Sequence, residues 1–475
     1  MANPVFSARN PRTGVHDYQC EHTTSAEIDD IVKRLRTTQP AWAALSVAER
    51  LKALEDFVAA VERRQDKVLA ALKADTGRSR IAQLECGALR GVLARVGADA
   101  KAMLVDIPAR PTMIPHIHGS GQYVPYGIMG NITPWNFPLL LSFIDTFPAL
   151  IAGNAVIIKP SEVTPRWVDP IREALKEVPL VDSILVIARG PGDTGAALIE
   201  RVDFVSFTGS VRTGRKVAEA AAKRFIPVFL ELGGKDPAVV LASANLDAAT
   251  SGILRASVAA TGQACQSLER VYVARPIYEA FVAKMVEKAK AVTIDMDDPE
   301  NGFVGPFIFD RQAEIVADHI KDAKAKGAKV LAGGELLTKG GKWMAPTVLV
   351  DVNHKMKVMT EETFGPVIPI MPFDTVDEAV KLANDTVYGL SASVYAGTAD
   401  EALPVARRLN GGAVSINDGS LTAMVQDTAH ESFGLSGMGA SRFGPEGVLR
   451  YVRRKALLNN TAGPMDVTGK IVPVS

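Results

Sequence analysis

Hydrophobic positions recur every three to four residues over the first part of the chain. In the stretch 25–74, Ile28, Ile31 and Leu35 fall on one side of a predicted helix, and charged residues fall on the other. Ser25 is a candidate for the residue that caps this helix. A further stretch with the same spacing follows it, so we predict that the N-terminal part of the chain is mainly helical.

The pattern changes after residue 126, where short apolar runs alternate with helical stretches. The runs that we predict to be buried strands are 127–132, 155–158, 183–187, 204–207 and 227–231. A helical stretch separates most neighbouring runs, including one of about a dozen residues after the second run. Strands that alternate with helices in this way indicate a parallel, doubly wound α/β sheet.

A second series of strands and helices begins after Gly233-Gly234. Its predicted strands are 238–241, 270–273, 347–350 and 367–371, and its predicted helices are 246–261, 276–292 and 311–326. The Pro-rich segment 107–122 reads as a strand-and-turn excursion, and the tail 448–475 reads as an extended segment that leaves the domain. Because 475 residues exceed what one core usually supports, we expect two or three domains.

Composition and charge exclude several classes of protein. The formal net charge is zero, so nothing electrostatic favours nucleic acid or an anionic membrane as a partner. We expect neither a signal peptide nor a membrane span, because no basic-then-apolar leader and no run of eighteen apolar residues occurs. Cys20, Cys86 and Cys265 lie far apart, which predicts no metal site and fits a reducing, cytoplasmic setting.

Cys265 and Glu231 are the first candidates for chemistry. Glu231 ends an apolar run just before a Gly-Gly turn, and Cys265 follows Gly262-Gln263-Ala264 further along the chain. A cysteine thiolate is a good nucleophile, and a nearby carboxylate can act as a base for it or for a water. A buried structural cysteine and a helix-capping glutamate explain the same residues about equally well when they are taken alone.

Polar side chains follow four strands of the first series, and ligands bind at the carboxyl ends of strands in parallel sheets. Besides Glu231, these polar tails are Trp135-Asn136, Lys159 to Glu162 and Thr208 to Ser210. We therefore expect them to converge on one crevice. Each tail also has a simpler explanation, because caps and turns between strands and helices use the same residue types.

Taken together, these motifs resemble those of the NAD(P)-dependent aldehyde dehydrogenase superfamily. The matching segments, in chain order, are 133–138, 153–162, 207–210, 231–235, 262–265, 362–366 and 436–439. They span nearly the whole chain, so the combination is far more specific than any single motif.

The resemblance implies an α/β fold with a Rossmann-type cofactor domain, an α/β catalytic domain and a small β oligomerisation element. The cofactor domain would cover residues 1–106 and 125–233, and the catalytic domain residues 234–442. The oligomerisation element would combine residues 107–124 with residues 443–475. Exposed strand edges invite pairing, so we expect a homodimer or homotetramer.

The resemblance also implies the catalytic roles. Cys265 would attack the aldehyde carbonyl, and Asn136 with the Cys265 backbone N–H would hold the resulting oxyanion. After hydride transfer to the cofactor, Glu231 would activate the water that hydrolyses the thioester to a carboxylic acid.

The cofactor-binding roles come from the same resemblance. The implied cofactor-binding residues are Lys159 and Glu162 for the adenosine ribose, Gly209, Ser210 and Trp135 for the pyrophosphate region, Glu362 for the nicotinamide ribose and Phe364 near the nicotinamide. Glu162 would repel a 2′-phosphate, so NAD is the expected cofactor, with NADP as the alternative.

Two departures from the family pattern limit what can be transferred. Family members often carry a Lys where this chain has Asp145, and the usual Phe-Gly-Gly is replaced here by residues 430–432, His-Glu-Ser. The second segment shapes the substrate entrance in relatives, so their substrate preferences do not carry over. Phe137 and Phe433 are candidates for an apolar substrate pocket, although core packing explains any single Phe as well. We expect the substrate to be a hydrophobic aldehyde, and aromatic aldehydes belong to this class.

Two other functions remain open from the sequence. A CoA-acylating dehydrogenase would resemble this chain, but relatives of that type tend to lack the general-base Glu, so Glu231 favours water as the acceptor. A non-redox binding or structural protein on the same fold would fold normally and produce no NADH.

Overall fold

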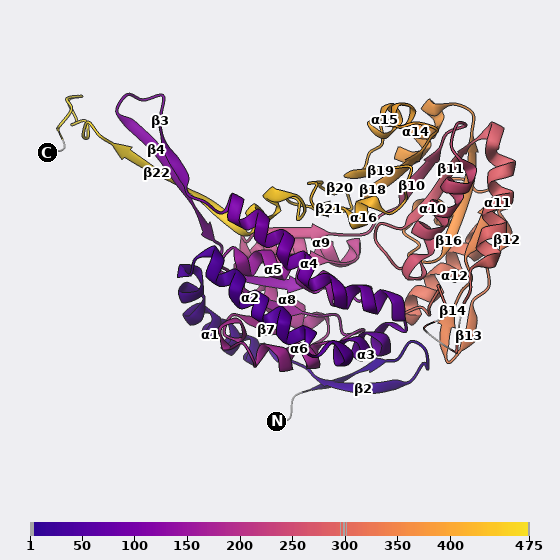
Figure 1. The fold of residues 1–475 in the computed structure, drawn as a ribbon, viewed down its shortest axis with the longest axis horizontal. Helices are drawn as coiled ribbons and strands as arrows, with labels where there is room; N and C mark the ends of the chain where they lie inside the picture. The colour runs from indigo at the N-terminus through magenta and orange to yellow at the C-terminus, as the bar shows by residue number, and fades with distance from the viewer. Residues whose placement is uncertain (1–3, 295, 298–299, 301, 474–475) are drawn as a thin grey trace.

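The computed structural model describes residues 4–294, 296–297, 300 and 302–473. The chain forms two α/β lobes side by side and a β arm that projects from the first lobe (Figure 1). The predicted cofactor domain began at residue 1 and the predicted tail ended at residue 475, so parts of both predictions, residues 1–3 and 474–475, lie outside the described part of the chain.

The N-terminal segment forms a hairpin followed by helices. Its elements are β1 (Val5–Arg9), β2 (His16–Glu21), α1 (Ser25–Ala44), α2 (Val47–Glu62), α3 (Gln65–Thr76) and α4 (Ser79–Met103). The cap of α1 is Thr24 rather than the expected Ser25, because Glu27 lies three positions after Thr24 and completes a capping box. Ser46 caps α2 in the same way, and the predicted helical region 25–74 contains the three helices α1, α2 and α3.

The first sheet has the strand order β21-β9-β8-β5-β6-β7, and all neighbours are parallel except β21 with β9. Its strands are β5 (Ile128–Ile132), β6 (Ala155–Lys159), β7 (Leu185–Ile187), β8 (Phe204–Thr208), β9 (Val228–Glu231) and β21 (Gly437–Met438). The covering helices are α5 (Leu140–Ile151), α6 (Val168–Leu175), α7 (Pro179–Asp182), α8 (Gly192–Ile199) and α9 (Val211–Arg224). This sheet confirms the predicted parallel, doubly wound architecture.

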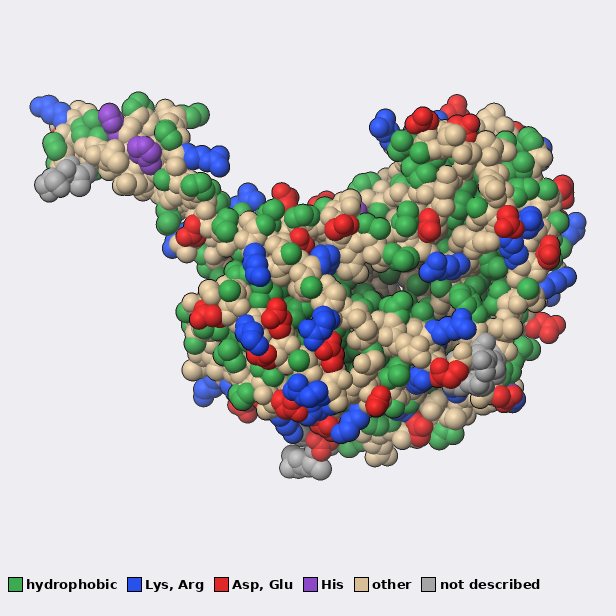
Figure 2. All heavy atoms as spheres, in the orientation of Figure 1, with side chains coloured by type: hydrophobic (Ala, Val, Ile, Leu, Met, Phe, Trp, Pro, Cys, Tyr) green, Lys and Arg blue, Asp and Glu red, His purple; other side chains and the backbone are tan. Residues whose placement is uncertain are grey.

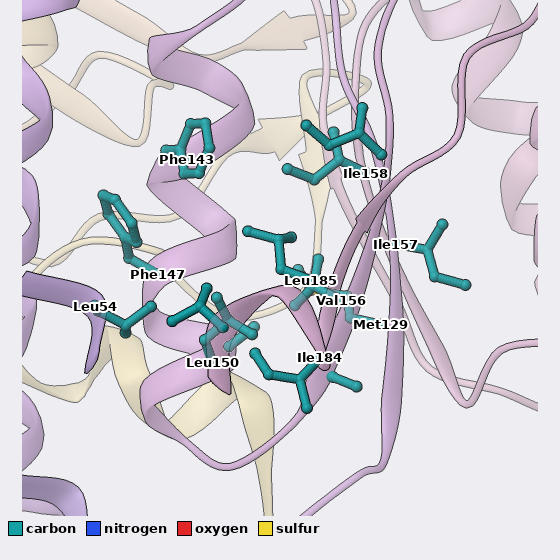
Figure 3. Packing of buried hydrophobic residues seen from close by; sticks show 14 of the residues in the cluster. Leu54, Met129, Phe143, Phe147, Leu150, Val156, Ile157, Ile158, Ile184 and Leu185 are labelled. Atoms are coloured by element: carbon teal, nitrogen blue, oxygen red, sulfur yellow. The ribbon is translucent and has the colours of Figure 1, made fainter. Parts of the chain in front are cut away.

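The core of the first lobe lies between α5 and this sheet. Figure 3 shows Phe147 of α5 on the side of Leu54 from α2, whereas Leu150 of α5 lies toward strand residues such as Val156 and Leu185. All five are at most 1% exposed, which explains why α5 is apolar on nearly every side. Where we expected one helix of about a dozen residues after β6, two shorter helices occur, and a proline at the first position of α7 starts the second.

The second sheet has the order β12-β15-β16-β11-β10-β18-β19, parallel throughout except for β12 with β15. Its strands are β10 (Asp236–Val240), β11 (Leu268–Ala274), β12 (Lys329–Ala332), β15 (Thr347–Val350), β16 (Val367–Phe373), β18 (Ser391–Tyr395) and β19 (Ala413–Ile416). The main helices are α10 (Leu246–Val258), α11 (Tyr278–Ala291), α12 (Asp310–Ala325), α14 (Val376–Asn384) and α15 (Ala399–Ala406). Separate apolar clusters cover the two faces of this sheet, which gives the second lobe a core of its own.

Several short strands and helices complete the second lobe and the segment in which the chain returns to the first lobe. The short strands are β13 (Leu337–Lys339), β14 (Gly341–Trp343), β17 (Tyr388–Gly389) and β20 (Phe433–Gly434). The short helices are α13 (Lys357–Thr360), α16 (Leu421–Met424) and the 3-10 helices η1 (Ala259–Gly262), η2 (Arg275–Ile277) and η3 (Pro445–Tyr451).

The arm is a three-stranded antiparallel sheet with the order β22-β4-β3. Its strands are β3 (Ile107–Pro111), β4 (Ile117–Pro125) and β22 (Val452–Asn460), so the tail pairs with the Pro-rich excursion. Figure 2 shows the arm standing away from the body of the molecule, with apolar side chains over it. Val448 and Tyr451, just before β22, are instead buried in the core of the first lobe.

A left-handed turn ends α10 and leads the chain toward Cys265. Ala260, Thr261 and Gly262 have φ of 54°, 63° and 67°, so the helix predicted over 246–261 stops at Val258. A Cβ on Gly262 would lie 2.3 Å from the carbonyl group of Gly365. Only glycine therefore combines this backbone conformation with this close approach.

Replacing Gly262 by alanine is expected to lower the thermal unfolding midpoint more than replacing Gly327. Gly327 also has a positive φ, 101°, but a Cβ there meets nothing within 4 Å. Gly327→Ala therefore adds only backbone strain, on the order of 1–2 kcal/mol, whereas Gly262→Ala adds the collision with a peptide group as well. Equal midpoints for the two variants, measured by calorimetry, would contradict this account of the turn.

Candidate active site

The polar strand tails lie at one edge of the first sheet, as the sequence predicted. Ile132, the last residue of β5, pairs with Lys159 of β6 on one side and with Phe207 of β8 on the other. Thr208, at the end of β8, pairs with Glu231 of β9. The carboxyl ends of four neighbouring strands are therefore level, and the residues that follow them share one region.

A buried ion pair joins this edge to the second lobe. Lys235 donates to the Oε2 of Glu269 at 2.6 Å, and both side chains are at most 5% exposed. Glu269 also accepts the backbone N–H groups of Thr363 and Phe364, each at 2.7 Å. One carboxylate thus ties together the chain after Glu231, the chain after Cys265 and the loop that carries Glu362.

Cys265 is a free, partly exposed cysteine in a region of negative charge. Burial raises the pKa of its thiol to about 12, and the charges that Asp236, Glu362 and Glu231 carry when they are ionised act in the same direction. Arg442 opposes them and favours the thiolate. The thiol is therefore protonated at neutral pH in the ligand-free protein.

The amide of Asn136 lies against the loop that leads into Cys265. Its Nδ2 donates to the carbonyl of Gln263 at 3.0 Å, and its side chain is buried. Arg78 donates to the Asn136 backbone carbonyl and, at 3.4 Å, to that of Ala260. The structure therefore brings Asn136 close to the loop of Cys265, where the two oxyanion donors were predicted. No motif in the sequence indicated the part played by Arg78.

Glu231 is bound by two buried arginines that the sequence analysis did not identify. Its Oε1 accepts from Arg442 Nε at 3.1 Å and from Arg450 Nη1 at 3.3 Å, and its Oε2 accepts from the Ser432 hydroxyl at 3.3 Å. Burial raises the pKa of Glu231, but the two guanidinium groups outweigh burial, and the net pKa lies below its ordinary value. Glu231 is therefore a carboxylate at neutral pH.

Asp145 is a sequence feature that could have indicated the buried arginines around Glu231. It is 1% exposed in the otherwise apolar helix α5, and a buried carboxylate needs a buried partner. That partner is Arg442, at 3.2 Å from Asp145 Oδ2. Nothing in the sequence around Arg442 distinguishes it from a surface arginine.

A cavity of about 540 Å³ lies between the start of α9 and the loop that carries Glu362. Ser210 caps α9 and lines the cavity together with Val211 and Arg212. Glu362 lines it as well and accepts the Gly234 N–H at 3.2 Å. Burial raises the pKa of Glu362 to about 8, helped by the charge of Glu269. A helix N-terminus beside a hydroxyl and a carboxyl group suits a pyrophosphate and an adjacent ribose.

The other predicted cofactor residues lie near the same strand ends. Lys159 is buried and donates to Glu162 Oε2 at 2.9 Å, while the Glu162 side chain keeps 43% of its surface exposed. Trp135 contacts Phe364 edge-on, with ring centroids 5.4 Å apart. Gly209 donates its N–H to the Glu231 carbonyl at 3.0 Å. These residues can present hydroxyl-binding groups and aromatic surface to a bound dinucleotide.

The two phenylalanines expected to form an apolar pocket lie in different environments. Phe137 is half-buried, and the Arg78 guanidinium lies 5.3 Å from its ring centroid. Phe433 is 44% exposed on β20, so it offers apolar surface to solvent rather than to an enclosed cavity. Their role with substrate stays a prediction.

Within the described residues, no three His, Cys, Asp or Glu side chains are placed to hold a metal ion. The helices of the same residues include none that is both long enough and apolar enough to cross a bilayer.

Comparison with known proteins identifies relatives along the whole chain. A model of the aldehyde dehydrogenase family matches residues 2–457. A protein of Mycolicibacterium smegmatis, inferred to be a succinate-semialdehyde dehydrogenase [NADP(+)], is 35% identical over 94% of this chain and 88% of its own length. The 4,4'-diapolycopene aldehyde oxidase of a Methylomonas species is 37% identical over 88% of this chain and 77% of its own.

A solved structure shares the fold over almost its full length. The inferred aldehyde dehydrogenase PutA from Anabaena variabilis is 49% identical, and the match covers 98% of this chain and 99% of that one. The TM-score is 0.95, so the two chains share the same overall fold.

The rate at which iodoacetamide alkylates Cys265 is expected to rise about tenfold for each pH unit from about pH 7 to about pH 10. Only the thiolate reacts, and a thiol with a pKa of about 12 gains thiolate in proportion to hydroxide over this range. Peptide mass spectrometry separates Cys265 from Cys20 and Cys86, and Cys265→Ala serves as the blank. A plateau below about pH 9 would show that burial and the neighbouring acidic groups do not hold the thiol protonated.

Proposed function

Because the chain belongs to the aldehyde dehydrogenase family, we propose that it oxidises an apolar aldehyde to the carboxylic acid, with NAD as the hydride acceptor. One observation carries the proposal: the Asn136 amide is bonded to the loop of Cys265, and Glu231 lies within electrostatic reach of the same thiol. A nucleophile, an oxyanion donor and a base therefore meet at one place.

In the first half of the reaction, Glu231 accepts the proton of the Cys265 thiol and passes it to solvent, and the thiolate sulfur attacks the carbonyl carbon of the aldehyde. The carbonyl oxygen takes the electron pair and becomes an oxyanion, which the Asn136 amide and the Cys265 N–H stabilise. A nicotinamide cofactor, when bound, would supply the acceptor for the hydride of this carbon, and loss of that hydride would leave a thioester on Cys265.

In the second half, Glu231 takes a proton from water while the water oxygen attacks the thioester carbon. The carbon–sulfur bond then breaks, the acid is released, and Cys265 leaves as a thiolate. A base that is ionised at neutral pH favours water over CoA as the acceptor, because CoA brings its own nucleophilic sulfur and needs no Glu231.

The cofactor roles follow from the donor groups at the strand ends. Ser210 and the N-terminal N–H groups of α9 would bind the pyrophosphate, and Glu362 would bind the nicotinamide ribose. Lys159 and Glu162 would bind the hydroxyls of the adenosine ribose. The Glu162 carboxylate would repel a 2′-phosphate, so we propose NAD over NADP, although the Mycolicibacterium relative is named for NADP(+).

Two features support an apolar substrate. The exposed Phe433 and the half-buried Phe137 provide aromatic surface on the segments expected to face the substrate. In addition, one relative is named for 4,4'-diapolycopene aldehyde.

The arm supports assembly into a homodimer or homotetramer. Met113 and Leu458 on the arm are 99% and 71% exposed, and β3 and β22 leave both edges of the sheet without a neighbouring strand in the described part of the chain. Pairing with another copy would cover these groups. The three free cysteines fit a reducing compartment, so we propose that the assembly is cytoplasmic.

Wild-type protein is expected to produce NADH from NAD and an aliphatic or aromatic aldehyde without CoA, and Cys265→Ala is expected to produce none. The loss follows because no thioester can form without the thiol. Absorbance at the NADH wavelength measures the rate, and Cys86→Ala, which removes a cysteine of α4, is the matched control with wild-type activity. Turnover only in the presence of CoA would refute the role of Glu231, and silence of folded protein across the panel would support a non-redox function.

Glu162→Gln is expected to lower the preference for NAD over NADP by about tenfold or more. The substitution removes a negative charge from the ribose site and releases the buried Lys159 from its ion pair, so a 2′-phosphate loses a repulsion and gains a cation. The ratio of kcat/KM for the two cofactors measures the effect. Asp374→Asn, which removes an exposed carboxylate in the second lobe, is the control; an unchanged ratio in Glu162→Gln would exclude Glu162 as the discriminating residue.

A further inference from the structure

The two places where this chain departs from the family pattern converge on one carboxylate. Ser432 belongs to the His-Glu-Ser segment and donates to Glu231 Oε2 at 3.3 Å. Asp145, where relatives often have Lys, reaches Glu231 through Arg442. The departures lie far apart in the sequence, so their meeting at the proposed base calls for a common explanation.

The three guanidinium nitrogens of Arg442 each contact a different side chain. Its Nε donates to Glu231 at 3.1 Å, its Nη1 to Asp145 at 3.2 Å and its Nη2 to the Thr208 hydroxyl at 3.1 Å. The Tyr451 hydroxyl donates to the other carboxylate oxygen of Asp145, Oδ1, at 2.7 Å. A planar fork bound at three points has one orientation, so the place of Glu231 Oε1 is fixed.

The buried charges of this cluster balance. Asp145 and Glu231 provide two carboxylates, and Arg442 and Arg450 provide two guanidinium groups. Arg450 is 1% exposed, and its guanidinium lies 4.5 Å from the ring centroid of Phe229. Removing any one member leaves an uncompensated charge away from water, which is costly.

Other titratable groups face Glu231 from the surrounding elements. Cys265 lies on the loop before β11, and His430 lies in the segment before β20 with its ring stacked on Phe443. Burial lowers the pKa of His430, so this side chain is neutral at neutral pH and adds no third cation. The two arginines and Asp145 therefore set the charge around Glu231.

We propose that Arg442 and Asp145 are a positioning pair for Glu231, which fix its Oε1 and leave its Oε2, beside the Ser432 hydroxyl, as the oxygen that accepts the proton of the hydrolytic water. The inference rests on the proposed role of Glu231 in thioester hydrolysis. It assigns a function to Asp145, which replaces the more usual Lys of relatives, and to Arg442 and Ser432. Arg442 stabilises the carboxylate, and Asp145 keeps that stabilisation moderate enough for Glu231 to remain a base.

The test uses p-nitrophenyl acetate and the full-length protein without cofactor. The Cys265 sulfur takes the acetyl group and releases p-nitrophenolate in a burst, and water then hydrolyses the acetyl thioester to acetate and free thiol in the steady phase. The steady phase therefore reports the Glu231 step even if no aldehyde is ever oxidised. A dehydrogenase assay that fails would disprove the proposed function but leave this measurement intact.

The two members of the pair predict shifts of opposite sign in the pH profile of the steady phase. Arg442→Met removes a cation from Glu231, so the acid limb of the profile should move up by about one pH unit or more. Asp145→Asn removes an anion, so the acid limb should move down. A burst should still occur in both variants, because Cys265 is unchanged, and Arg442→Lys, which keeps the charge but loses the planar guanidinium, should keep the wild-type limb with a lower rate.

Arg166→Met is the matched control, because Arg166 and Asp75 form another buried pair, 2.6 Å apart, outside the proposed catalytic residues. It should cost stability and leave the acid limb in place. Shifts of the same sign in Arg442→Met and Asp145→Asn, or a lower rate with no shift in either, would reduce the pair to a structural role. If Arg442→Met does not fold, the test rests on Asp145→Asn alone. An acid limb that does not move to lower pH in that variant would overturn the proposal.

Discussion

The buried pair of Lys235 and Glu269 is the constraint on which the site depends. Lys235 lies shortly after Glu231 in the chain, and Glu269 lies shortly after Cys265. The Glu269 carboxylate also accepts two backbone N–H groups that follow Glu362. A buried ion pair that loses one partner costs about 3–5 kcal/mol, so the three segments cannot separate cheaply. The base, the nucleophile and the ribose-binding acid are thus held together by a group that performs no chemistry itself.

Close to the Lys235–Glu269 pair, the protein shifts the pKa values of Cys265 and Glu231 in opposite directions. Burial keeps the Cys265 thiol protonated, with the ionised Glu231 acting in the same direction, while two arginines keep Glu231 ionised. Groups whose environments push their pKa values apart are the ones that exchange protons usefully in an enzyme. Since Arg442 acts on both groups, a single guanidinium couples the ionisation of the nucleophile to that of the base.

The sequence predicted the strands and the motif residues well because both leave local patterns. Buried parallel strands appear as short apolar runs, and the strand tails carry polar residues in fixed order, so the first sheet and the placement of Asn136 and Lys159 followed. Helix boundaries were less predictable: the end of α10 depends on a left-handed turn, and the start of α1 depends on Glu27 rather than on Ser25. Partners such as Glu269 and Arg442 were missed because their role arises only from contacts distant in sequence.

The late segment from Ser432 to Tyr451 explains how the base is connected to both lobes. Its strand β20 pairs with β17 near the second sheet, and its strand β21 pairs with β9, the strand that ends in Glu231 (Figure 1). The same segment then supplies Arg442 and Arg450 before it enters the arm. This segment therefore connects the residues that hold Glu231 to both lobes. Because a fork bound at three points tolerates little displacement, the setting of the base requires the two lobes to keep a fixed relation.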